Sequence, residues 1–252
     1  MAGSADAPAG AVGAPIPPDH PAALLLARGG LEEARATIDG CRACDLWQRA
    51  TQGVFGAGTP AARLMLVGEQ PGDREDLAGE PFVGPAGRLL DEALAEAGID
   101  REQAFVTNVV KHFKWRPSGT KRLHDRPSRQ QVNACRPWLD LELELVRPEL
   151  LVLLGATAAQ AILGPAFRVT VDHGRILDPA AQGGPRLMAT LHPSAVLRAR
   201  TPEAREEARR MLVADLAAAA EILAEAVPGR PVAGRARSGR GRSPRGARAG
   251  HR

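Results

Sequence analysis

The chain has 252 residues, of which 44% are hydrophobic, enough for one α/β domain with tails or for two small domains. Its net charge of +4 is unevenly placed. Residues 228–252 carry eight arginines and no acid, so residues 1–227 carry a net charge of −4. This distribution argues against a uniformly basic protein and assigns the basic character to a terminal arm.

The cysteine count and the N-terminal sequence indicate the compartment. There are three cysteines, two of them in a C-x-x-C pair, and an odd number argues against a disulfide framework. The N-terminus has neither the cationic start nor the apolar run of a signal peptide. No stretch reaches the length of a transmembrane helix. We therefore expect a soluble, cytoplasmic monomer with no membrane partner.

Apolar runs alternate with helical patterns along the chain. Residues 1–20 are rich in Ala, Pro and Gly and are expected to be disordered. The elements predicted after them are a helix over Pro21–Ile38, a strand over Arg63–Gly68, a helix over Pro85–Ala97, a strand over Ala104–Val110, a helix over Ser128–Arg147, a strand over Leu150–Gly155, a helix over Ala156–Leu163, a strand over Leu187–Leu191 and a helix over Pro202–Val227.

This alternation predicts an α/β fold with a parallel sheet covered on both faces. We expect a three-layer α/β/α sandwich whose central, mostly parallel sheet has four strands. The predicted domain spans residues 31–227. A weakly ordered segment over residues 1–30 precedes it, and a disordered Arg-rich tail over residues 228–252 follows.

Polar residues follow the carboxyl ends of the predicted strands. Glu69 and Gln70 come after the first strand, Asn108 lies near the end of the second, and His192 follows the last. In open α/β sheets the ligand crevice lies outside the carboxyl ends of the strands. These four side chains are therefore expected to converge, although they are far apart in the sequence.

Cys41, Cys44, His112 and Cys135 form a candidate set of four metal ligands. The C-x-x-C pair can bind one centre from a single turn, and two more ligands would complete a zinc site or hold an iron–sulfur cluster. The wide separation between Cys41 and Cys135 favours a cluster. The alternative is a redox pair with Cys135 as a packing residue.

A basic segment over Lys114–Arg129 lies between two of these candidate ligands and is predicted to be a loop. It contains one histidine, His124, surrounded by basic residues. From composition alone, the favoured interpretation is a DNA-contacting loop in which His124 has no chemical role. Phe82 lies in a Gly- and Pro-rich segment and could stack on a planar ligand or pack in the core.

Four ordered motifs resemble the uracil-DNA glycosylase superfamily. They are GEQPGD at 68–73, PFVGPAGRLL at 81–90, TNVVKHFKW at 107–115 and LHPSA at 191–195, within a match over about residues 38–220. The C-x-x-C pair with a later cysteine is similar to the iron–sulfur branch, family 4. His112 and the insertion with the pattern R-x-H-x-x-P-S resemble the class X (UdgX-type) enzymes.

The resemblance implies a role for each matching residue. It implies a 4Fe-4S cluster, with zinc as the alternative, on the four candidate ligands. It implies catalytic roles for Glu69, His124 and His192. It implies uracil binding by Gly68, Gln70, Phe82, Asn108 and Ser194, and DNA contact by Lys121, Arg122, Arg126, Ser128 and Arg129. Asp125 stands where a lysine is common, and we expect it to raise the pKa of His124 slightly.

The implied activity is removal of uracil from DNA, with single strands preferred. The target nucleotide must leave the base stack, after which Glu69 would stabilise the positive sugar and His192 the uracil anion. His124 would then attack C1′ and leave the protein covalently attached to the abasic DNA. The alternatives are a conventional glycosylase that releases its product, and a non-catalytic, metal-stabilised DNA-binding module.

Overall fold

The computed structural model describes residues 16–28, 30–179 and 184–225. In these ranges the chain forms a six-stranded sheet with the order β1-β3-β2-β6-β8-β7 and a separate hairpin, β4-β5. The strands are β1 (Ala57–Gly58), β2 (Leu64–Gly68), β3 (Ala104–Asn108), β4 (Trp115–Ser118), β5 (Lys121–His124), β6 (Leu150–Leu154), β7 (Ile176–Leu177) and β8 (Arg186–Thr190). The Arg-rich tail lies outside the described residues, so its disorder stays a prediction.

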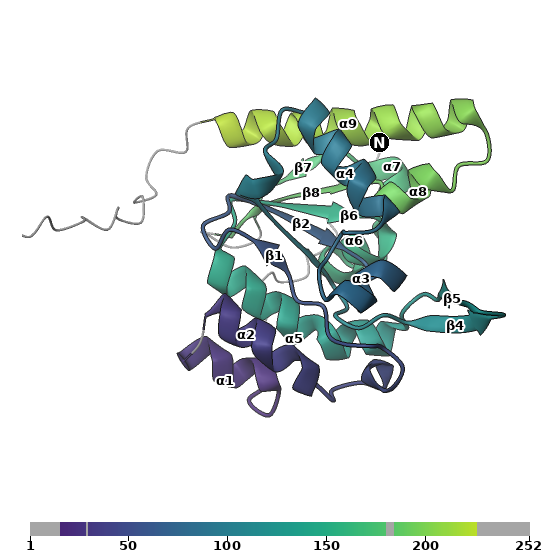
Figure 1. Cartoon of the computed structure of the whole chain (residues 1–252). Coiled ribbons are helices and arrows are strands. Elements are labelled where there is room, and N and C mark those ends of the chain that lie inside the picture. Colours follow the sequence, from purple (N-terminus) through teal and green to yellow (C-terminus); the bar gives the residue numbers. More distant parts are fainter. Residues whose placement is uncertain (1–15, 29, 180–183, 226–252) are drawn as a thin grey trace, which may run out of the picture.

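Helices cover both faces of the sheet (Figure 1). Helices α1, α2, α5 and α6 contribute to the hydrophobic core on one face, and α4, α8 and α9 to the core on the other. The α-helices are α1 (Pro21–Arg28), α2 (Leu31–Thr37), α3 (Asp73–Ala78), α4 (Pro85–Glu96), α5 (Arg129–Val146), α6 (Ala156–Leu163), α7 (Val169–Asp172), α8 (Pro193–Leu197) and α9 (Pro202–Ala224). Short 3₁₀ turns lie at Ile38–Gly40, Leu46–Gln48 and Arg101–Gln103.

The three-layer α/β/α prediction is confirmed. The four central strands, β3-β2-β6-β8, are parallel, and alternate side chains of each strand face opposite helical layers. On β2, for example, Met65 and Val67 join one core cluster while Leu64 and Leu66 join the other. The antiparallel edge strands β1 and β7 were not predicted. Each has only two residues, too few for a periodicity to be read.

Two predicted elements are wrong. The single helix over Pro21–Ile38 is two helices, α1 and α2, because Gly30 adopts an extended conformation as the N-cap of α2. Helix α1 packs on α5 and buries Ala22 and Leu25, within the segment expected to be weakly ordered. The predicted loop over Lys114–Arg129 contains the β4-β5 hairpin, which projects from the body beside α3 in Figure 1.

Within the described ranges, no helix combines the length and the apolar character needed to cross a bilayer.

A buried ion pair connects the sheet to the helical layer. Lys111 and Glu142 side chains are both 0% exposed, and Lys111 Nζ lies 2.6 Å from Glu142 Oε2. Lys111 Nζ also donates to Thr107 Oγ1 and to the carbonyl of Asn108, while Glu142 Oε1 accepts from the backbone N–H of Gly56. Such a pair is strongly destabilised when one partner is lost, because an unpaired charge then stays buried.

We expect Glu142→Gln to lower the free energy of unfolding by roughly 3–5 kcal/mol, since it leaves Lys111 as an unpaired buried charge. The double variant Lys111→Met/Glu142→Gln removes that charge and should recover most of the loss. Urea denaturation measures both. As a control, Arg63→Gln breaks an exposed pair with Glu149 and should cost less than about 1 kcal/mol. Equal losses in the single and double variants would contradict the argument.

Candidate active site

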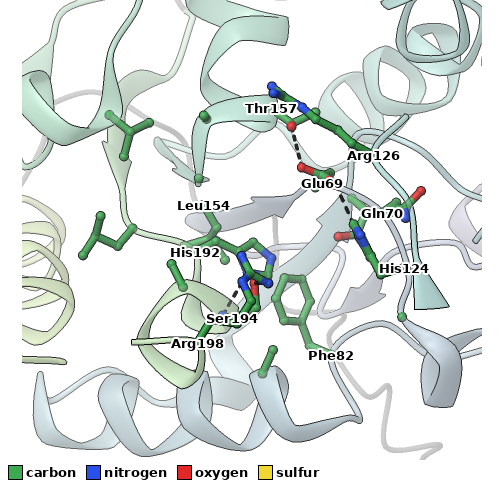
Figure 2. A pocket seen from close by; sticks show the side chains of 18 of the residues that line it. Glu69, Gln70, Phe82, His124, Arg126, Leu154, Thr157, His192, Ser194 and Arg198 are labelled. Carbon is green, nitrogen blue, oxygen red and sulfur yellow. Dashed lines mark hydrogen bonds and ion pairs between the residues drawn. The ribbon is translucent and has the colours of Figure 1, made fainter. Parts of the chain in front are cut away.

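A cavity of about 540 Å³ lies at the carboxyl edge of the central strands (Figure 2). Glu69 and Gln70, which follow β2, line it together with Asn108 at the end of β3 and His192 after β8. The convergence predicted from the strand ends is therefore confirmed. The volume lies within the usual range for a small-molecule site.

Glu69 has a side-chain contact on each carboxylate oxygen. Its Oε2 accepts a hydrogen bond from Thr157 Oγ1 at 2.5 Å, and its Oε1 lies 3.4 Å from His124 Nε2. Both contacts are drawn in Figure 2. The histidine that the sequence placed on a remote insertion therefore faces the carboxylate that follows β2.

Arg122 fastens the hairpin to the body. Its Nε donates to Asp73 Oδ1 and its Nη1 to Asp76 Oδ2, each at 2.6 Å. The Asp76 side chain is 0% exposed and also accepts from the hydroxyl of Thr51. The guanidinium that was expected to contact DNA is thus held by two carboxylates of α3. Because His124 lies two residues after Arg122, this contact helps to fix its place.

Gln70 joins the two ends of the hairpin. Its amide nitrogen donates to the carbonyls of Lys114 and Asp125, and its amide oxygen accepts from the backbone N–H of Lys114. Both the nitrogen and the oxygen of the Gln70 side-chain amide are therefore used in hydrogen bonds to the backbone. Uracil binding by this residue would have to use its backbone.

The two pocket histidines are both shifted toward the neutral form. Burial is the main cause that lowers the pKa of His192 to about 4, and positive charge on Arg198 or on protonated His124 acts in the same direction. Burial also lowers the pKa of His124, and it outweighs the opposing effects of Glu69 and Asp125. Asp125 thus acts in the expected direction, but the net shift of His124 is downward.

A backbone contact fixes the tautomer of neutral His192. The N–H of Ser194 donates to His192 Nδ1 at 3.1 Å, so Nδ1 must carry a lone pair and Nε2 the proton. His192 therefore offers an N–H donor from Nε2. The Ser194 hydroxyl accepts from Arg198 Nη1 at 2.9 Å, which holds this cation beside the cavity.

The base-recognition residues predicted from the sequence are packed against one another. Phe82 and Asn108 both line the cavity, and the ring of Phe82 lies 6.0 Å from that of His192. Phe82 has a φ of 59°, a left-handed conformation that is unusual for a bulky side chain. A Cβ on Gly68 would lie 2.4 Å from Asn108 Oδ1 and 2.7 Å from the Phe82 ring, so the glycine provides space for both.

The remaining predicted DNA contacts lie in different settings. Lys121 and Arg129 are exposed, and Arg126 lines the cavity. Ser128 is the N-cap of α5, where its hydroxyl accepts from the N–H of Gln131 and its own N–H donates to the side chain of Gln131. This capping box gives Ser128 a structural role.

The cysteines lie close enough for their charges to interact. Burial is the main cause that raises the pKa of Cys135 to about 12; Cys44 and Cys41 act in the same direction and Lys111 opposes them. Burial likewise raises the pKa of Cys44, with a contribution from Cys41. Because burial favours the neutral thiols, formation of the thiolates would require positive charge nearby, which a bound metal centre supplies. His112 is also buried and has a lowered pKa for the same reason.

The cofactor predicted from the sequence remains a prediction. In the described part of the chain, no group of three or more His, Cys, Asp or Glu side chains that could hold a metal ion is found. The iron–sulfur cluster and its zinc alternative are therefore both untested. Two of the sulfurs already accept N–H donors: Cys41 from the Trp138 indole and Cys135 from the backbone of Lys111, both at 3.2 Å.

Three residues of the site were missed by the sequence reasoning. Thr157 contacts Glu69, and Arg198 lies beside His192. Glu75 lines the cavity and accepts from the N–H of Gly84 at 2.9 Å. Thr157 could have been found, because it follows the one predicted strand end that was given no site residue. Glu75 lies in α3 and Arg198 is the C-cap of α8, where spacing gives no such signal.

A family model described as "Uracil DNA glycosylase superfamily" matches residues 55–217, which include every cavity residue discussed above. The chain belongs to the uracil-DNA glycosylase superfamily. This membership accounts for the three-layer fold and agrees with the position of the cavity at the carboxyl edge of the sheet.

Similar members of the superfamily carry the name type-4 uracil-DNA glycosylase. The Thermotoga maritima protein is 36% identical over 187 residues, covering 74% of this chain and 91% of the relative. The Archaeoglobus fulgidus protein is 38% identical over 182 residues, covering 70% and 87%. The Sulfurisphaera tokodaii protein is 40% identical over 133 residues, covering 52% of this chain and 57% of the relative.

The lowered pKa of His192 predicts a dependence of stability on pH. The unfolded chain takes up a proton on this histidine near pH 6.5, whereas the folded protein does so only near pH 4. The free energy of unfolding should therefore fall as the pH drops between these values. In an NMR titration the His192 ring should titrate near pH 4, and higher in Arg198→Ala. A wild-type ring that titrates at pH 6.5 would contradict the argument.

Proposed function

We propose that this protein excises uracil from DNA and then becomes covalently linked to the abasic site through His124. One observation carries the proposal: His124 Nε2 lies 3.4 Å from Glu69 Oε1 in the wall of a cavity that Asn108 and His192 also line. Membership of the superfamily and the names of the type-4 relatives support the excision step. The covalent step rests on the position of His124.

The flipped nucleotide would enter the cavity with its base against Phe82. An enzyme that acts on a base must take it out of the stack or receive it from a single strand. Phe82 offers a ring face, and Asn108 offers both a donor and an acceptor to the edge of uracil. The conformation of Phe82 is held by close packing, since a Cβ on Gly87 would lie 1.6 Å from the Phe82 carbonyl oxygen.

His192 would stabilise the leaving uracil. As the C1′–N1 bond breaks, its electron pair moves to uracil, and negative charge spreads onto the base oxygens. The neutral imidazole of His192 offers its Nε2–H, and the Arg198 cation lies nearby. Preorganised donors aimed at developing charge give large rate effects.

His124 and Glu69 would act on the sugar. The carboxylate of Glu69 stabilises the positive charge that develops at C1′. Its Oε1 can also accept the Nε2 proton of a protonated His124, which leaves the neutral ring with its proton on Nδ1 and a lone pair on Nε2. That lone pair forms the bond to C1′ as the C1′–N1 bond breaks. The alkylated ring then loses its Nδ1 proton to solvent, and the departing uracil anion takes up a proton from solvent. Fixed proximity makes a neutral imidazole an effective nucleophile.

Conventional turnover is the second candidate. The His124 side chain is 49% exposed, so water can reach the same region and compete for C1′. The type-4 relatives favour this candidate, because their name describes glycosylases. A non-catalytic DNA-binding module would have no use for an acid, an amide and a histidine at three separate strand ends.

Cations at the cavity and on the hairpin would bind the DNA backbone. Arg126 and Arg198 line the cavity, and Lys121 and Arg129 are exposed. Contacts of this kind are sequence-independent and weaken with salt. We propose single-stranded DNA as the preferred substrate, because it presents the base already unpaired.

Cys41, Cys44, His112 and Cys135 would hold a 4Fe-4S cluster. When bound, the cluster supplies a cross-link between the segment that contains the C-x-x-C pair, the end of the β3 region and α5, and no chemical step requires it. The electrostatic effects of Cys41 and Cys44 on Cys135 and the N–H donors to two of the sulfurs support this proposal.

Incubation with a uracil-containing single strand should give a protein–DNA band that survives boiling in SDS. His124→Ser should remove the band, because serine cannot provide the imidazole nitrogen, while water can still release abasic DNA. His173→Ser, at a histidine outside the cavity, is the matched control and should keep the band. Free abasic DNA and no band in the wild type would establish conventional turnover. A band that persists in His124→Ser would reassign the nucleophile.

The cluster predicts about four iron and four sulfide atoms per protein and a broad absorption near 400 nm, since four-iron clusters have that composition. Cys135→Ser should lower the iron content and the absorption, because it removes one ligand. A colourless protein that contains zinc and no iron would contradict the proposal. The measurement is independent of the covalent adduct.

A further inference from the structure

The turn between β6 and α6 touches two catalytic candidates at once. Gly155 has a φ of +87°, and a Cβ at this position would lie 2.9 Å from His192 Cβ. Its N–H donates to the carbonyl of Thr190 at 2.9 Å, which ties the turn to the end of β8. Two residues later, the hydroxyl of Thr157 donates to Glu69 Oε2. The turn therefore lies between His192 and Glu69.

We propose that Thr157 is a positioning residue that orients the Glu69 carboxylate toward His124 and the sugar. The inference rests on the proposed function, to which it adds a residue of the first turn of α6. Thr157 holds Oε2, and this leaves Oε1 as the oxygen that faces His124 Nε2. Figure 2 shows the three side chains in a row, with Glu69 in the middle.

The contact network of Glu69 makes the hydroxyl important. In the described ranges, Thr157 forms a hydrogen bond with one oxygen of the Glu69 carboxylate, and His124 Nε2 lies 3.4 Å from the other. The terminal torsion of a glutamate is broad, so a carboxylate held at one oxygen only can rotate. Thr157 is 7% exposed and lies in the first turn of α6, where its backbone cannot follow the carboxylate. Without the Thr157 hydroxyl, the Glu69 carboxylate could rotate, and neither of its oxygens would be held toward His124.

A purely structural role for Thr157 makes a different prediction. If the residue only packs at the start of α6, valine should replace it well, because valine has nearly the same shape. Serine should then be worse, since it lacks the methyl group. If the hydroxyl orients Glu69, the order is reversed: serine should function and valine should not.

The experiment measures single-turnover uracil release and adduct formation on one uracil-containing single strand. We expect Thr157→Val to slow uracil release about 10- to 100-fold, the range for a lost hydrogen bond to a charged group. Thr157→Ser should remain within about threefold of the wild type. Thr59→Val, at a half-buried threonine outside the active-site cavity, is the matched control and should match the wild type. Thermal unfolding checks that each variant is folded.

The share of product that is bound to protein provides a second readout. Because Glu69 Oε1 faces His124, we expect Thr157→Val to shift products from adduct toward free abasic DNA, which a mere loss of folded protein would not do. A wild-type rate and product ratio in Thr157→Val, or a Thr157→Ser variant as slow as Thr157→Val, would overturn the inference. If the valine variant does not fold, Thr157→Ala takes its place. Absence of uracil release in the wild type would instead overturn the proposed function.

Discussion

The buried pair of Lys111 and Glu142 is the interaction on which the site depends. The side chain of Lys111 donates to the carbonyl of Asn108, and its backbone N–H donates to the sulfur of Cys135. Glu142 brings α5 to the same point and also receives the N–H of Gly56. One ion pair therefore connects the end of β3, the segment before β1 that contains Gly56, and α5. Removing either charge would disturb all three, since neither charge has water nearby to replace its partner.

The hairpin is attached to this frame by polar contacts with the segment that follows β2. Glu69 and Gln70 start that segment, and Asp73 and Asp76 lie in the helix after it. The same short stretch thus supplies the carboxylate that faces His124 and the carboxylates that hold Arg122. As a result, the distance between Glu69 and His124 depends on contacts within one local unit, although the two residues are far apart in the sequence.

The sequence predicted the central strands, the long helices and the converging strand ends, because each depends on local hydrophobic periodicity and on the geometry of parallel sheets. Strands as short as β1 and β7 have no such pattern. The hairpin was expected to be a loop, because no local pattern marks it as strands. It is held by hydrogen bonds that join Arg122 and Gln70 to residues far away in the sequence. The basic character of the segment indicated DNA contact for Arg122, but composition could not show that Arg122 forms an ion pair with buried Asp76. The buried ion pair of Lys111 could not be predicted from the sequence either, since a lysine usually indicates an exposed position.

Asp125 shows how local contacts can compensate for an unusual residue. Its carboxylate lies 3.7 Å from Lys114 Nζ, so the charge that could repel a phosphate has a partner at the other end of the hairpin. Its N–H donates to the carbonyl of Lys114, and its own carbonyl accepts from Gln70. The backbone of Asp125 therefore closes the hairpin directly after His124, whatever side chain it carries. The acid also raises the pKa of His124, yet burial dominates and leaves the imidazole biased toward the neutral form that nucleophilic attack requires.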